Sequence, residues 1–190
     1  MVKKLHVLFL ITLFLTAGCS YQHSLKVEEP SYSGAVYPPV YLVVRPPGEY
    51  VTGGQIEYAN EFTQELSARK KFRAFTNYTG SEYTLDIVYG GMDTRSHLQK
   101  IWWVITAASL FIVPHQFEAE FTMEARIYKH NQLIKQYSYK DVLTGWSSLF
   151  NFPRSEMSKM HGQFVDRFLN DLEKDNVFVD TASRAKTNSI

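Results

Sequence analysis

Apolar and polar residues alternate most strictly between Phe117 and Tyr128. Every second residue there is apolar, and the residues between them are mostly charged. This period of two is typical of a strand with one face on a core and the other in water. Four further segments rich in β-branched and aromatic residues predict strands in the rest of the chain: 40–47, 72–78, 83–92 and 133–146.

Two segments show the spacing of helices. Thr52 and Gln55 have the spacing of a capping box, and apolar residues then recur every three or four positions to about Lys70. A longer amphipathic segment follows Pro153. The resulting order, β-α-β-β-β-β-α, predicts an α+β two-layer sandwich in which two helices cover a mostly antiparallel sheet of about five strands. We expect one domain over residues 40–179.

An apolar block without a charged residue, Ile101–Val113, separates the third and fourth of these strands. It predicts a helical insertion near residues 98–113, before Pro114. Antiparallel strands bring this block and the aromatic connection Gly145–Pro153 to the same edge of the sheet. Large aromatic residues of the two connections form the predicted contact surface for a membrane or a partner: Trp102, Trp103, Phe111, Trp146 and Phe150.

Such a surface needs a cover, and three are conceivable. A membrane-spanning helix is disfavoured, because the block as a helix extends about 20 Å and a bilayer core is about 30 Å thick. The protein itself could cover the block, as a short helix packed beside the sheet. The bilayer surface or a partner protein could also cover it, with Ala107, Ala108 and Ser109 packed inward and the tryptophans outward.

The N-terminus has the pattern of a signal peptide. Lys3 and Lys4 precede an apolar stretch, which gives way to small residues and a cysteine in Leu15-Thr-Ala-Gly-Cys19. The alternative is an uncleaved anchor helix with a buried cysteine. The ending resembles the lipobox of bacterial lipoproteins, which implies cleavage before Cys19 and acylation of that residue. We therefore expect a signal peptide at 1–18, a lipidated tether at 19–39 and a flexible tail at 180–190. Ser20 in place of Asp implies sorting to the outer membrane.

Composition narrows the function further. The single cysteine excludes an intramolecular disulfide, and loss of Lys3 and Lys4 leaves 18 basic against 19 acidic residues. A near-neutral chain without a basic cluster argues against nucleic acid as a partner. The histidines lack the spacing of a metal site, and no nucleophile motif is present. We expect no enzymatic activity, no metal and no cofactor.

The element order and the lipobox together resemble two kinds of Gram-negative lipoprotein, the curli-secretion channel lipoprotein and the lipoprotein activators of penicillin-binding proteins. The resemblance implies a non-enzymatic interaction or assembly module of the cell envelope, anchored in the outer membrane through Cys19 and facing the periplasm. Its implied partners are the lipid bilayer and an envelope protein. The alternative is a membrane-inserting or oligomer-forming component of an envelope transport or secretion complex.

Overall fold

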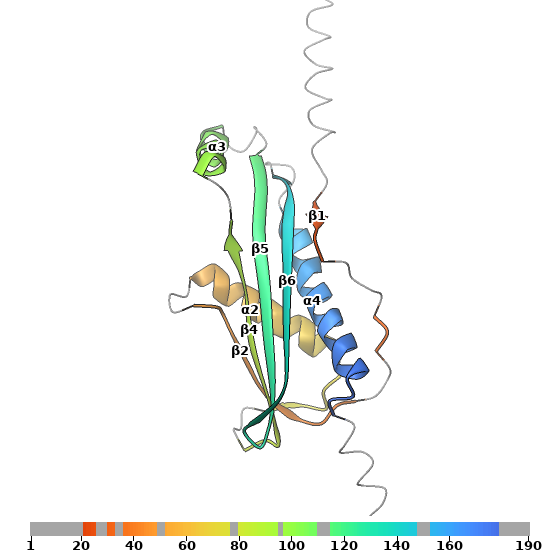
Figure 1. Cartoon of the computed structure of the whole chain (residues 1–190). Coiled ribbons are helices and arrows are strands. Elements are labelled where there is room, and N and C mark those ends of the chain that lie inside the picture. The colour runs from red at the N-terminus through yellow and green to blue at the C-terminus, as the bar shows by residue number, and fades with distance from the viewer. Residues whose placement is uncertain are drawn as a thin grey trace, which may run out of the picture. The chain divides into compact units, whose positions relative to one another are not determined.

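The computed structural model describes residues 21–25, 30–32, 36–48, 52–76, 80–94, 97–109, 115–147 and 153–178. Within them the elements follow the chain in this order (Figure 1): β1 (Gln22–His23), β2 (Val40–Arg45), α2 (Gly53–Ala68), β3 (Phe75–Thr76), β4 (Tyr83–Asp93), α3 (His97–Ala108), β5 (His115–Lys129), β6 (Gln132–Ser147) and α4 (Arg154–Lys174). The predicted α+β fold class is confirmed. The expected apolar insertion is the helix α3, and strand β1 is an addition to the expected order.

The sheet is mixed, with the strand order β1-β6-β5-β4-β2-β3. Strand β2 pairs in parallel with both β3 and β4, because the chain returns to the sheet through the crossover helix α2. The β5–β6 hairpin turns at His130 and Asn131, whose φ angles of 49° and 65° place both residues in the left-handed region. Two such residues are typical of the type I′ turn, whose twist matches that of paired strands.

The chain divides into two compact units. Unit 1 comprises residues 1–24, 92–120 and 141–157, and unit 2 comprises residues 25–91, 121–140 and 158–190. Strands β4, β5 and β6 and helix α4 contribute residues to both. We describe each unit by itself.

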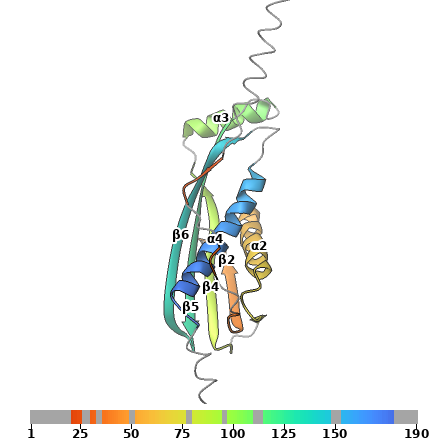
Figure 2. The ribbon, with the colours of Figure 1, turned by 90° about the vertical axis from the view of Figure 1, so that its right-hand side faces the viewer.

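The core of unit 2 lies between the strands and the two helices α2 and α4, which cover the same face of the sheet (Figure 2). Tyr83, Leu85, Ile87 and Tyr89 of β4 are almost completely buried, as their two-residue period predicts. The ring of Tyr89 lies 4.6 Å from that of Phe62 and 5.5 Å from that of Phe164, measured between centroids. One strand residue thus contacts both helices.

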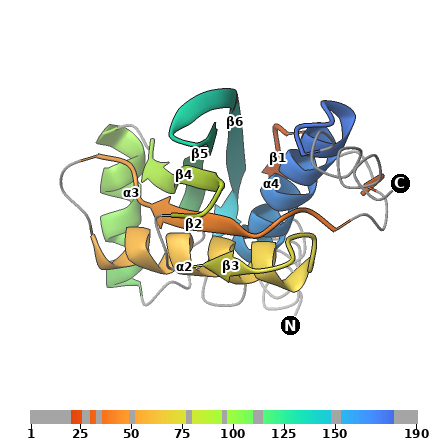
Figure 3. The same cartoon turned by 90° about the horizontal axis from the view of Figure 1, so that it is seen from below.

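Helix α2 begins with the capping box expected from the sequence. The Thr52 hydroxyl accepts a hydrogen bond from the backbone N–H of Gln55, and the Gln55 side chain accepts one from the backbone N–H of Thr52. The two bonds satisfy amide groups that the first turn leaves without helical partners. The helix then packs along β2 (Figure 3).

Part of the segment expected to be a free tether is docked on unit 2. Tyr37 is buried, and its backbone exchanges hydrogen bonds with Lys71 and Arg73. The Lys71 ammonium lies 5.0 Å from the Tyr32 ring centroid and 5.4 Å from that of Tyr37. The expectation of a tether through residue 39 therefore differs from the structure, because tyrosines that looked like linker residues act as aromatic anchors. The signal peptide at 1–18 and the tail at 180–190 lie outside the described residues.

A polar cluster sits in the core of unit 2. The Tyr89 hydroxyl lies 2.6 Å from His161 Nδ1, and His161 Nε2 lies 2.9 Å from a carboxylate oxygen of Glu61. The His161 side chain is fully buried, and this burial lowers its pKa to about 4, against a smaller opposing effect of the Glu65 charge. A neutral imidazole suits the tyrosine, because Nδ1 can then accept from the hydroxyl, whereas Nε2 lies near the Glu61 carboxylate without the geometry of a hydrogen bond.

This burial predicts an acid-sensitive stability. The unfolded chain takes up a proton on His161 near pH 6.5, whereas the folded chain does so only near pH 4. The free energy of unfolding should therefore fall as the pH drops from 6.5 to 4, by up to about 3 kcal/mol from this group. Urea unfolding across that range should show a flatter pH dependence for His161→Gln than for the unmodified chain. His130→Asn, at the exposed turn, is the matched control, and equal slopes for all three proteins would contradict the assignment.

Candidate functional site

The outer face of α3 in unit 1 is apolar. Ile101, Val104 and Ile105 are 58%, 61% and 46% exposed, and Ala108 on the same face is also exposed. These positions follow the helical spacing of three and four residues and so form one stripe. Trp102 beside the stripe is 55% exposed, whereas Thr106 on the other side of the helix is fully buried. Thr106 rather than Ile101, Val104 or Ile105 faces the protein.

This arrangement inverts the amphipathicity of an ordinary surface helix, which turns its apolar stripe inward. Covering one such side chain completely gains about 1.5–3 kcal/mol. Five half-exposed ones, Ile101–Ile105, represent on the order of 5 kcal/mol of uncovered apolar surface by the same rule. Of the covers considered for this block, the protein itself therefore leaves all five of these side chains at least 40% exposed. Among the described residues, no helix is long and apolar enough to cross a bilayer.

Two further exposed apolar side chains belong to unit 1. Met92, at the end of β4, is 56% exposed, and Trp146, near the end of β6, is 49% exposed. Helix α3 connects the end of β4 to the start of β5, so it lies at the sheet end that β6 also approaches (Figure 1). Of the five predicted contact residues, Trp102, Trp103 and Trp146 are thus exposed within one unit. Phe111 and Phe150 lie outside the described residues, as does Cys19.

The N-terminal strand β1 is the feature of unit 1 that the sequence did not indicate. Gln22 pairs with Thr144 and His23 with Leu143, antiparallel to β6. Asp141, whose side chain is fully buried, accepts hydrogen bonds from His23 Nδ1 at 3.1 Å and from the Ser24 hydroxyl at 2.8 Å. The Ser24 hydroxyl also accepts from the backbone N–H of Val142 at 2.8 Å. These side-chain bonds hold in place a strand too short to be stable by its backbone pairing alone.

An aromatic contact fastens the residue before β1. The Tyr21 ring meets that of Phe117 edge-on, with 6.5 Å between the centroids. It also lies over Gly145, where an added Cβ would come within 2.3 Å of the Tyr21 ring. Gly145 therefore provides the space that the ring occupies. A glycine inside a predicted strand is the one signal that could have indicated a close approach at this point.

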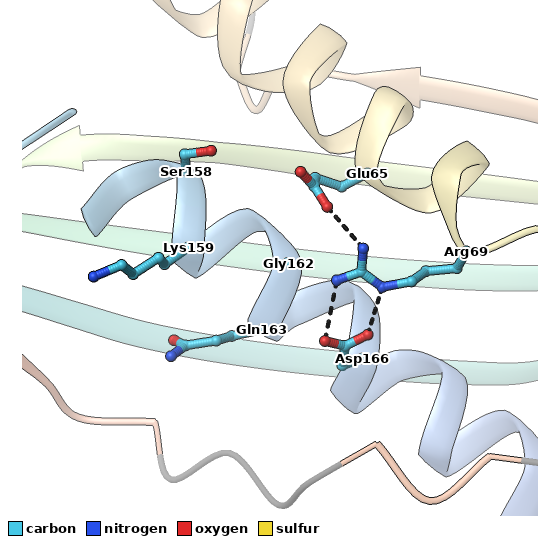
Figure 4. Close-up of a pocket in the computed structure, with 7 residues that line it drawn as sticks. All are labelled: Glu65, Arg69, Ser158, Lys159, Gly162, Gln163 and Asp166. Atoms are coloured by element: carbon cyan, nitrogen blue, oxygen red, sulfur yellow. Dashed lines mark hydrogen bonds and ion pairs between the residues drawn. The ribbon is translucent and has the colours of Figure 1, made fainter. Parts of the chain in front are cut away.

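A shallow hollow between α2 and α4 in unit 2 is the other candidate site (Figure 4). Its central group is Arg69, which donates to both carboxylate oxygens of Asp166, at 2.8 and 3.1 Å, and to Glu65 at 2.9 Å. The Asp166 bond is the main cause that raises the pKa of Arg69. Because all three nitrogens of the guanidinium have partners within the protein, this cluster is best understood as a clamp between two helices.

Among the described residues, no group of three or more His, Cys, Asp or Glu side chains is placed to hold a metal ion. On the sheet, Glu124 accepts from Gln136 at 2.9 Å and also pairs with Arg126. Lys135 pairs with Asp175 at 2.9 Å.

Comparison with protein-family models and with curated protein sequences finds no match. Solved structures with a similar fold include rare lipoprotein B from Shewanella oneidensis, at 13% identity and a TM-score of 0.43, covering 75% of this chain and 98% of that one. Uncharacterized lipoprotein B from Nitrosomonas europaea is 14% identical with a TM-score of 0.42, and the match covers 80% of this chain and 94% of that one. A minor lipoprotein from Acinetobacter baumannii is 10% identical with a TM-score of 0.36, and the match covers 73% of this chain and 91% of that one. The similarity is one of fold at low identity to small bacterial lipoproteins, and the resemblance to the curli-secretion and penicillin-binding-protein activator types stays a prediction.

The docking of β1 can be tested at Asp141. Asp141→Asn keeps the size of the side chain, but its NH₂ group cannot accept the bond that the carboxylate accepts from His23. We expect a local loss of about 1–3 kcal/mol and faster hydrogen exchange at the backbone amides of Ser24 and Val142. Ser138→Ala, at an exposed position of the same strand, is the control. Unchanged exchange in the Asp141 variant would show that these bonds do not hold β1.

Proposed function

We propose that this chain is a lipoprotein of the bacterial outer membrane that faces the periplasm and is anchored by acyl groups on Cys19. The support is the sequence from Leu15 to Cys19, with its basic and apolar segments in front, and Ser20 behind it. Several acyl chains, at about 0.8 kcal/mol per buried methylene, make a stable anchor where a single chain is marginal. Because Cys19 is the single cysteine of the chain, it cannot form an intramolecular disulfide, and its thiol is available for acylation.

In this proposal the protein is a non-enzymatic interaction or assembly module. The observation that carries the proposal is the apolar outer face of α3, which occupies the place where a surface helix ordinarily has polar residues. The well-ordered polar clusters, by contrast, are engaged in holding elements together: Arg69 between two helices, His161 in the core and Asp141 at β1. The exposed apolar face of α3 is therefore the surface that we propose for contact with another molecule.

A second candidate function follows from the same surface. A run of five exposed apolar residues in one short helix would also suit a membrane-inserting or oligomer-forming component of an envelope transport or secretion complex. The two candidates differ in the contact that α3 makes. The module places α3 against a partner protein or the bilayer surface, whereas the second candidate inserts α3 into lipid or uses it to assemble copies of the chain.

The anchor can be tested by labelling. Cells that express the full chain and are fed radioactive palmitate should label it, and Cys19→Ser should abolish both the label and cleavage of the signal peptide. The unmodified chain should sediment with outer-membrane fractions on a sucrose gradient. Ser20→Asp is the matched variant: it keeps the thiol, so it should keep the label but move to inner-membrane fractions. An unlabelled, uncleaved wild-type chain would contradict the anchor, and an unmoved Ser20 variant would contradict the sorting.

A further inference from the structure

We propose that the occupant of the α3 surface is the lipid bilayer in which Cys19 is anchored. Helix α3 would lie flat in the headgroup region, with Ile101, Val104 and Ile105 toward the acyl chains. The protein would then hold its membrane at two points, the acylated cysteine and this helix. This inference rests on the proposed function, because it takes Cys19 as the first point.

The direction of β1 is the first argument. Strand β1 runs antiparallel to β6, and Tyr21 lies beside Gly145, two residues before β6 ends at Ser147. The N-terminal end of β1 therefore points to the sheet end of unit 1 at which β6 ends and α3 connects β4 to β5. A chain that descends from the membrane into β1 arrives from the side that carries α3.

The length of the connection is the second argument. Only two residue steps separate Cys19 from Tyr21, which is at most about 7 Å of chain. Tyr21 is fastened by Phe117 and Gly145, and the following residues are fastened by Asp141. Acyl chains on Cys19 would hold this end of unit 1 against the headgroups, whereas a free tether through residue 39 would have allowed about 70 Å.

The chemistry of α3 suits the interface rather than the bilayer interior. Its twelve residues extend about 18 Å, too short for a core of about 30 Å. Tryptophan, which α3 carries beside its apolar stripe, is the side chain most typical of the membrane–water boundary. Lys100 is the one Lys or Arg in the helix, so attraction to anionic lipid contributes little and the contact depends on apolar burial.

The two attachments support each other. Covering the outer face of α3 is too weak to capture a protein from solution, since association costs translational and rotational freedom. A lipid anchor two residues from the fold removes most of that cost, because it holds α3 at a high effective concentration over the bilayer. A protein partner or a second copy of the chain would have to compete for α3 with the bilayer, which the anchor keeps close to this helix.

The test uses the full chain reconstituted in phosphatidylethanolamine and phosphatidylglycerol vesicles whose acyl chains carry bromine, a short-range quencher of tryptophan fluorescence. Trp103→Phe combined with Trp146→Phe leaves Trp102 as the single reporter, since the chain has three tryptophans. We expect brominated lipid to quench Trp102 at least two-fold and the vesicles to shield it from iodide in the water. Quenching by iodide with none by lipid would overturn the proposal. So would shielding from both quenchers, which indicates a protein or a second copy on α3.

A matched pair of substitutions separates docking from general hydrophobicity. Ile105→Glu places a charge on the outer face of α3 and should weaken docking about ten-fold, seen as loss of lipid quenching. Ile134→Glu, at a similarly exposed isoleucine of β6 in unit 2, should leave the quenching unchanged. Equal effects of the two would overturn the proposal. Both variants keep the same N-terminal attachment, so this result is independent of palmitate labelling, and failure of the anchor and failure of the α3 contact are distinguishable.

Discussion

Apolar side chains that a fold turns toward water are the constraint on which the rest of this protein depends. In unit 2 the problem is solved internally, since α2 and α4 cover the apolar face of the strands. In unit 1, α3 turns Ile101, Val104 and Ile105 outward and buries Thr106 instead. Covering these side chains would remove apolar surface from water, which is favourable. The proposed function is based on this helix, because a contiguous exposed apolar surface is typical of a contact site.

The second determinant is the fastening of the N-terminal segment. A two-residue strand contributes little by itself, yet His23 and Ser24 bond to buried Asp141, and the Tyr21 ring lies over Gly145 and against the ring of Phe117. Together these contacts fix residues 21–24, and the antiparallel pairing with β6 sets the direction of β1. The residues that fasten β1 belong to the same unit as α3.

Unit 2 has the character of a scaffold. Its polar side chains form clusters that hold elements together. In one, Arg69 lies between Asp166 and Glu65, and in the other, His161 lies between Tyr89 and Glu61. Lys71 lies against the rings of Tyr32 and Tyr37, so even the segment before β2 is held by aromatic contacts. The polar groups of these side chains are thus engaged in contacts that stabilise the fold. Unit 2 thus covers its apolar strand face and pairs these polar groups internally, whereas unit 1 leaves apolar side chains of α3 exposed.

The sequence by itself determined the secondary structure apart from β1, because period and capping are local: the alternation in β5, the capping box at Thr52 and the apolar run of α3 each act within a few residues. It also marked Trp102, Trp103 and Trp146 as unusual. The tertiary structure decided what depends on residues far apart, as with Tyr21 over Gly145, or His23 and Ser24 on Asp141. It likewise decided that α3 turns its apolar face outward, since the pattern of a helix defines a stripe but not the side on which the protein lies.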